Sequence, residues 1–214
     1  MNRIKRICIK YVLTMRKIIL LFFIFLPFFL NAHEPNYGLY FKSHRYMGAE
    51  RTALVLNNNK PFSLNKEFIL SFDMSLRNEF IFGTVFKIIS DTQDVISLNF
   101  IADEKNNQYP ILSINDNVYP ITNRIELNKW FFVNIRFSAK KDSVLLDYDK
   151  IHLAIPFSFK DWREVSLYFG VCRHSNFSSA EIPPMNVRDI KIHSNNKLIR
   201  YWQLKRHTID CCYD

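Results

Sequence analysis

Apolar and polar residues alternate with a period of two along most of the chain beyond its N-terminal apolar run. The pattern occupies five segments, at residues 67–75, 95–102, 130–138, 143–149 and 164–171. Strict alternation of this kind is typical of half-buried antiparallel strands. In the clearest segment, WFFVNIRFS, it predicts a strand inside its sheet whose inward residues are buried, namely Phe131, Val133, Ile135 and Phe137.

Short polar breaks separate these segments where hairpin turns are expected, at NDN (115–117), AKKDS (139–143) and DYDK (147–150). Because the chain has only four glycines, we expect asparagine and aspartate to supply many of the turns. No window of about 11 residues repeats apolar groups at helical spacing, so no long helix is expected. Roughly a dozen short strands predict an all-β fold, in which two antiparallel sheets pack face to face as a β-sandwich of the jelly-roll type.

The first 32 residues have the composition of a secretory signal peptide. The segment MNRIKRICIKYVLTMRK has six basic residues and no acidic one, and the apolar run IILLFFIFLPFFL and the residues NAH follow it. A basic segment, a short apolar segment and a small residue before the cut form such a signal, so we expect export and cleavage after Ala32. A retained membrane anchor would need about 20 apolar residues, whereas this run is shorter and contains Pro27. No membrane span is expected after cleavage.

Removal of the signal changes the charge of the chain. The full sequence has 29 Lys and Arg against 20 Asp and Glu. Six of the basic residues precede His33, so 23 basic and 20 acidic residues remain, a net charge of +3. A nucleic-acid partner requires basic residues clustered on one face, and none is expected here.

Cys8 leaves with the signal, so three cysteines remain, Cys172, Cys211 and Cys212. An odd number leaves at least one thiol unpaired within the chain, and a bridge from Cys172 to one of the other two stays open.

Beyond Leu204 the alternation ends, and residues 205–214 are expected to form a loosely held tail, because a segment without an apolar face gains little by ordering.

Several segments together resemble a laminin G-like, or concanavalin A-like, jelly roll: PFSLNKEFILSFDMSLR, FGTVFKIIS, VISLNF, LNKWFFVNIRFSAKKDSVLLDYD and MNVRDIKI. In that family a strand that opens with Trp leads through a hairpin into a strand that ends in Asp, as at Trp130 and Asp149 here. The family usually has Gly after this Asp, where the present chain has Lys150. The resemblance covers residues 37–204 and implies one β-sandwich domain at 33–204.

The two ends of that domain are similar to the N-terminal jelly-roll module of secreted bacterial proteins that continue into kelch-type β-propellers. The segments concerned are YGLYFKSHRYMGAERTALVLNNNKPFSL and EIPPMNVRDIKI with LIRYWQLKRH. The resemblance implies that residues 205–214 are a domain junction. A truncated reading frame and a free-standing module both stay open.

The sequence offers few candidates for catalysis or metal binding. Glycoside hydrolases on this fold resemble one another in a Glu-x-Asp-x-x-Glu strand, which sets two carboxylates on one face. The chain has no such run, so we expect no enzymatic activity. Related jelly rolls often hold calcium at a sheet rim, and calcium prefers carboxylate oxygens. The candidate calcium ligands are Asp91, Asp94, Asp147 and Asp149, although SDTQD (90–94) fits a plain turn equally well. No other cofactor is expected.

Aromatic side chains at outward strand positions are the candidate ligand contacts. A pyranose ring has an apolar face that stacks on an aromatic ring, and Trp130, Tyr168 and Trp202 occupy such positions, as does Phe132. The alternative is that these rings pack in the core or at sheet edges. Alternation alone does not distinguish the two.

These features predict an exported, non-catalytic binding or accessory module that is periplasmic, at the bacterial cell surface or extracellular, with a glycan as the expected ligand. A structural or protein-docking module of a truncated propeller protein is the alternative, with a cell-surface protein as its partner. A degenerate hydrolase is the third hypothesis.

Overall fold

The computed structural model describes residues 37–63, 67–105, 107–121, 126–138 and 140–204, together with the backbone of 206–207 and 212–213. The expected signal peptide, its cleavage site and Cys211 lie outside these residues. Most of the predicted loose tail also lies outside them. Its described part pairs β15 (Arg206–His207) with β16 (Cys212–Tyr213). No helix in the described ranges has the length and hydropathy needed to span a membrane.

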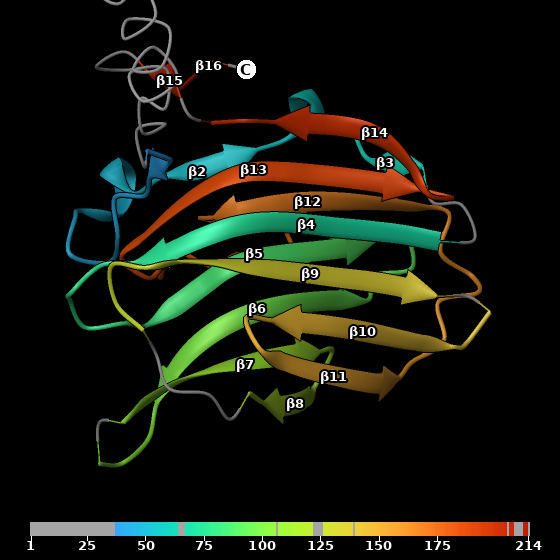
Figure 1. The fold of residues 1–214 in the computed structure, drawn as a ribbon, viewed down its shortest axis with the longest axis horizontal. Helices are drawn as coiled ribbons and strands as arrows, with labels where there is room; N and C mark the ends of the chain where they lie inside the picture. The colour runs from blue at the N-terminus through green and yellow to red at the C-terminus, as the bar shows by residue number, and fades with distance from the viewer. Residues whose placement is uncertain are drawn as a thin grey trace, which may run out of the picture. The chain divides into compact units, whose positions relative to one another are not determined.

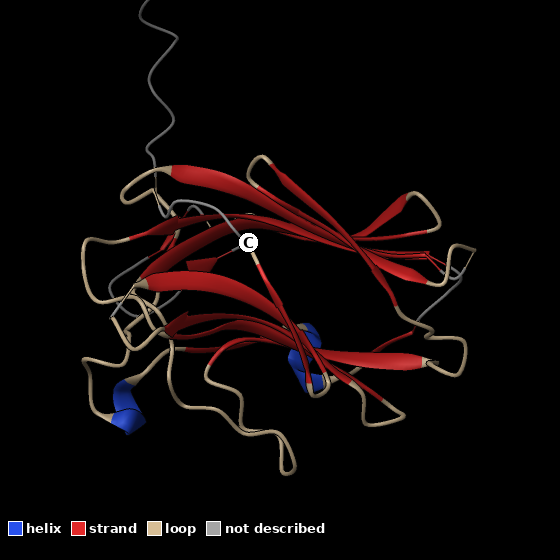
Figure 2. Ribbon diagram, turned by 90° about the horizontal axis from the view of Figure 1, so that it is seen from below, coloured by secondary structure: helices blue, strands red, loops and turns tan. Residues whose placement is uncertain are grey.

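Two antiparallel sheets of seven strands each build the domain, and Figure 2 shows them as two layers. Sheet A has the spatial order β1 (Leu39–Tyr40), β13 (Met185–Ser194), β4 (Glu67–Leu76), β9 (Trp130–Ser138), β10 (Ser143–Tyr148) and β11 (Ile151–Pro156), and β14 (Lys197–Trp202) also pairs with β13. Sheet B has the order β2 (Ala53–Val55), β12 (Glu164–Gly170), β5 (Gly83–Ser90), β6 (Val95–Ala102), β7 (Gln108–Ile114) and β8 (Asn117–Pro120), and β3 (Phe62–Ser63) also pairs with β12. This arrangement, followed strand by strand in Figure 1, confirms the predicted two-sheet β-sandwich.

The inward residues of each strand form one core between the sheets. In β9, which lies between β4 and β10, Val133, Ile135 and Phe137 are buried as predicted. Phe131 is only partly buried, because it stands at the start of the strand with its ring against Tyr148, 5.0 Å between centroids. The prediction of full burial was therefore wrong for this one residue.

Phe72 joins the two sheets at the centre of that core. This β4 side chain packs edge-on against Phe169 of β12 and Phe86 of β5, with ring centroids 5.0 and 5.8 Å away. All three rings are fully buried. Such edge-to-face pairs add to the stabilisation gained from burial alone.

Asparagine and aspartate supply most of the left-handed residues outside glycine, as the scarcity of glycine predicts. Asn115, Asp142 and Asp149 have positive φ in the three predicted hairpins. Short polar side chains tolerate this conformation better than other non-glycine residues. At the β10–β11 turn the left-handed position is Asp149 itself, so the chain turns there without the glycine that the family usually has next.

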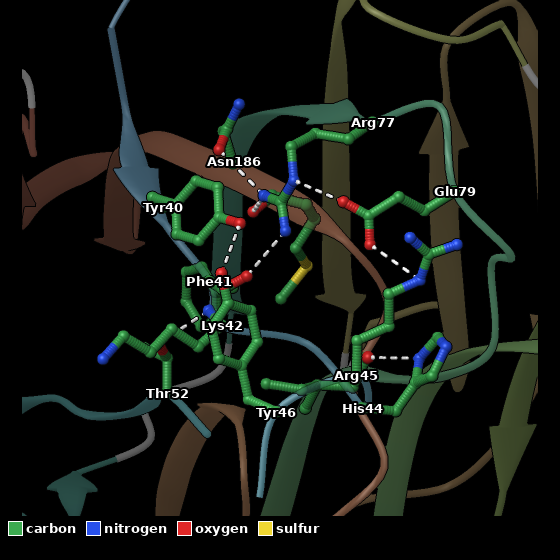
Figure 3. A network of polar contacts seen from close by, with 12 residues as sticks. Tyr40, Phe41, Lys42, His44, Arg45, Tyr46, Thr52, Arg77, Glu79 and Asn186 are labelled. Atoms are coloured by element: carbon green, nitrogen blue, oxygen red, sulfur yellow. Dashed lines mark hydrogen bonds and ion pairs between the residues drawn. The ribbon is translucent and has the colours of Figure 1, made fainter. Parts of the chain in front are cut away.

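Arg77, directly after β4, ties together three segments at one end of sheet A (Figure 3). Its guanidinium donates to the carbonyl oxygens of Met185 (2.6 Å) and Phe41 (2.8 Å) and lies 3.9 Å from the centre of the Tyr40 ring. The Glu79 carboxylate lies 3.6 Å from its Nε. A planar guanidinium bonds in several directions at once, which suits it to this structural role.

Candidate functional site

A row of side chains crosses the outer face of sheet B at the level of Tyr168. Tyr168 pairs with Val55 on one side and with Lys87 on the other. Lys87 then pairs with Ser97, which pairs with Ser113. Residues directly opposite each other in an antiparallel ladder share a face of the sheet, so these side chains lie next to one another although they come from five different strands.

Residues 173–178, here called the flap, fold over this row. Reciprocal backbone hydrogen bonds of 2.9 and 3.0 Å between Cys172 and Ser179 close the base of the flap. Lys87 Nζ donates to the carbonyl oxygen of Phe177 (3.0 Å), and Asn176 Nδ2 donates to Gln93 Oε1 (3.1 Å). Burial lowers the pKa of Lys87. The flap is therefore fastened to β5 and to the β5–β6 hairpin.

Two neighbouring cavities lie beside the flap. The Tyr168 cavity, of about 350 Å³, is lined by Val55, Asn58, Asn59, Tyr168 and Arg173. The smaller His174 cavity, of about 180 Å³, is lined by Pro61, Ile89, Ser90, Asp91, Gln93, Glu164, Ser166 and His174. The rings of Tyr168 and His174 stand edge to face with centroids 6.4 Å apart, so the two cavities adjoin at this contact.

Three consecutive left-handed asparagines form one wall of the Tyr168 cavity. Asn57, Asn58 and Asn59 have φ values of 57°, 52° and 61°. Asn57 Nδ2 donates to the carbonyl oxygens of Lys60 (3.0 Å) and Pro61 (3.3 Å), which holds the turn. Non-glycine residues pay a conformational cost in this region, and such residues cluster at functional sites. Here the turn places the Asn58 and Asn59 amides on the cavity.

The polar groups around the Tyr168 cavity have unused hydrogen-bonding capacity. Within the described part of the chain, the side chains of Asn58, Asn59 and Arg173 make no hydrogen bond or ion pair, and neither does the Tyr168 hydroxyl. Tyr168 is only 8% exposed and packs against Ile89 and Cys172. A rigid aromatic wall and four polar groups without protein partners thus meet at one cavity.

The other two predicted aromatic contacts lie elsewhere. Trp130 is on sheet A, where the Arg188 guanidinium covers its ring at 4.1 Å and its edge abuts Gly38 so closely that a Cβ there would stand 2.5 Å away. Trp202 packs edge-on against Phe62, 6.1 Å between centroids, at the margin of the core. Neither Trp130 nor Trp202 lines the cavity at Tyr168, and their role as ligand contacts stays a prediction. Phe132 is 51% exposed on the outer face of sheet A.

The four aspartates proposed for calcium lie on two different sheets. Asp91 and Asp94 belong to the β5–β6 hairpin of sheet B, and Asp147 and Asp149 to the β10–β11 hairpin of sheet A. Asp147 accepts hydrogen bonds from Asn134 (2.8 Å) and His152 (2.7 Å). No group of three or more His, Cys, Asp or Glu side chains that could hold a metal occurs among the residues the structure describes. The four carboxylates therefore do not form one calcium site. Cys172 is buried and has no disulfide partner among the described side chains.

The Asp94 carboxylate is expected to contribute to a decrease in the free energy of unfolding at acidic pH. Partial burial raises the pKa of Asp94, but hydrogen bonds from Trp162 Nε1, Thr92 Oγ1 and Asn115 Nδ2 outweigh that effect, so its pKa lies below the ordinary value of about 3.9. A carboxyl with a lower pKa in the folded state contributes stability that is present above about pH 4–5 and is lost as pH falls through the folded-state pKa.

Urea unfolding between pH 6 and pH 2.5 measures this contribution. Asp94→Asn should show a shallower loss of stability below pH 4 than the unchanged protein. Asp116→Asn, an exposed aspartate in the next hairpin, is the matched control. Equal acid slopes for Asp94→Asn and the unchanged protein would contradict the prediction.

Comparisons with known proteins identify the fold. No protein-family model matches the chain, and no curated protein matches it. Among solved structures, the enzymatically active domain of tailspike protein 2 from bacteriophage CBA120 has a TM-score of 0.51 and 13% identity, over 72% of this chain and 28% of that one. Domains LG4-5 of the mouse laminin alpha1 chain have a TM-score of 0.47 and 14% identity, over 70% of this chain and 42% of that one. CG-16, a homodimeric agglutinin from chicken liver, has a TM-score of 0.45 and 11% identity, over 66% of this chain and 100% of that one.

At these identities the likeness concerns the fold alone. The tailspike domain shares the fold of this chain at a TM-score of 0.51, and the two seven-stranded antiparallel sheets form the predicted β-sandwich. The predicted fold is confirmed. The continuation into a kelch-type propeller stays a prediction.

Proposed function

We propose that this protein is a glycan-binding module that holds a sugar in the Tyr168 cavity. The observation that carries the proposal is the meeting of Asn58, Asn59, Arg173 and the Tyr168 hydroxyl, none of which has a protein partner within the described residues, around a cavity of about 350 Å³. Small-molecule sites typically have volumes of roughly 300–1,000 Å³ and a few convergent polar groups on an apolar wall.

The chemistry of these groups suits a polyhydroxylated ligand. An amide side chain both donates and accepts, and so does a tyrosine hydroxyl. A sugar hydroxyl has the same dual capacity, and each bond made in a partly enclosed site contributes about 0.5–1.5 kcal/mol. The largely buried Tyr168 ring supplies the apolar wall at this site.

Two further parts of the proposal rest on the sequence. The expected signal peptide at residues 1–32 supports export, and the lack of a Glu-x-Asp-x-x-Glu run supports a non-catalytic role. Turnover of a bound glycan during the binding experiment below would contradict the non-catalytic part.

The test is a glycan-array screen followed by titration of the best ligand against glycine variants. Asn58→Gly and Asn59→Gly remove an amide each but preserve the left-handed backbone, which glycine adopts without strain. Each should weaken binding roughly five- to tenfold, equivalent to about 1–1.4 kcal/mol. Asn128→Gly, at another left-handed asparagine that does not line the cavity, should bind as the unchanged protein does. An array without binding, or equal affinity in all variants, would refute the proposed site.

A further inference from the structure

We infer that the Tyr168 cavity selects glycans with a single terminal carboxylate, which Arg173 binds, and this inference rests on the proposed function. Arg173 is the one charged residue among the five that line the cavity. It differs from the arginines that hold the fold, each of which has an acidic partner. Those pairs are Arg51–Glu181 (2.7 Å), Arg188–Asp73 (3.4 Å) and Arg77–Glu79 (3.6 Å).

The position of Arg173 is fixed by the base of the flap. It directly follows Cys172, which is buried and bonded through both backbone groups to Ser179. The guanidinium therefore starts from a rigid point beside Tyr168, although the side chain itself is exposed. Binding therefore costs the ordering of the Arg173 side chain but not of the backbone that carries it.

The donors around Arg173 match a carboxylate. A guanidinium presents two parallel N–H groups to the two oxygens of a carboxylate, and charge-assisted bonds of this kind are about twice as strong as neutral ones. Each oxygen has a further lone pair, and the amides of Asn58 and Asn59 and the Tyr168 hydroxyl are the donors at hand. A neutral sugar would use the amides but not the charge.

The neighbouring His174 cavity limits the ligand to one carboxylate. Asp91 and Glu164 line it, and the Arg163 backbone N–H, 3.0 Å from Asp91 Oδ1, lowers the pKa of that carboxyl. Ser166, which lines this cavity, and Tyr168 are two residues apart on one face of β12, about 7 Å along the strand. When an acidic sugar binds at Arg173, the next sugar of the glycan therefore lies near the carboxylates of Asp91 and Glu164. A second carboxylate on that next sugar would be repelled.

The first experiment compares matched sugars. Methyl glucuronide and methyl glucoside share a ring and differ in one carboxylate, and their dissociation constants can be measured by NMR titration. We expect the unchanged protein to bind the acid at least tenfold more tightly, with the preference falling as salt increases. Sialic acid-capped and glucuronic acid-capped neutral oligosaccharides then distinguish the two common sources of a terminal carboxylate, and a polyuronate tetramer should bind more weakly than either.

Arginine variants locate the effect. Arg173→Gln should bind acid and neutral sugars equally, while Arg173→Lys should keep a reduced preference because an ammonium lacks the two-pronged geometry. Arg136→Gln makes the same charge change at an exposed site on sheet A and should leave the preference intact.

The outcomes separate the inference from the proposed function. Three results would overturn the inference while glycan binding stands. They are equal affinity for the two methyl sugars, an equal loss of the preference for the acid in Arg173→Gln and Arg136→Gln, and tightest binding of the polyuronate. Binding of no sugar at all, on the array or in titration, would overturn the proposed function itself.

Discussion

Replacing Phe72 with alanine should lower the free energy of unfolding by about 3–5 kcal/mol. The side chain is fully buried and is the β4 ring on which Phe86 and Phe169 of sheet B pack. Its loss leaves a cavity between the two sheets, and the neighbouring rings come from different strands that cannot all move inward to fill it. Urea unfolding at neutral pH measures the change as a lower midpoint with an unchanged slope.

Phe132→Ala is the matched control, because it removes the same side chain from an exposed position on the outer face of sheet A. It should change stability by less than about 0.5 kcal/mol. If the two variants lost similar stability, the inward and outward faces of the strands would be assigned wrongly.

The alternation of apolar residues was sufficient to predict the two sheets, because burying one face of a strand demands a period of two wherever it occurs. Val133, Ile135 and Phe137 are buried on this ground alone. Phe131 departs from the prediction because burial also depends on how far a strand extends over its partner sheet. That property depends on distant segments and leaves no local pattern.

The site was harder to predict for the same reason. Tyr168 is on the outer face, as the alternation predicts, yet it is buried because the flap folds over it. Trp130 is also on an outer face, but Arg188 of β13 covers it. Trp130 is covered by a residue far from it in sequence, and Tyr168 is covered by a loop without regular structure.

Asn58, Asn59 and Arg173 were not predicted as site residues. The run NNNK before Pro61 was a usable signal, because three consecutive asparagines are suited to a left-handed turn. Arg173 offered no such signal. Its importance comes from the lack of an acidic partner among the described residues, and ion pairs between distant segments are visible in the structure alone.

Gly83→Ala should destabilise the protein by about 4 kcal/mol, and this prediction tests how tightly sheet B is joined to the loop before β13. Gly83 begins β5 with φ of +110°, where side chains with a Cβ are strongly disfavoured. A Cβ would lie 2.4–2.5 Å from the backbone atoms of Glu181 and Ile182. The Thr84 backbone N–H bonds to the Glu181 carbonyl oxygen at 2.8 Å, so the two segments cannot separate without losing that bond. Backbone strain costs roughly 1–3 kcal/mol and overpacking a similar amount.

Thermal and urea unfolding of Gly83→Ala and Gly48→Ala provide the comparison. A Cβ at Gly48 would meet no atom within 4 Å, and its φ is not positive, so alanine there should be neutral or stabilise slightly by restricting the unfolded chain. The difference between the two variants isolates the close approach at residues 181–182 from the general effect of adding a methyl group. If Gly83→Ala proved as stable as Gly48→Ala, the loop at 181–182 would not pack against β5 as described.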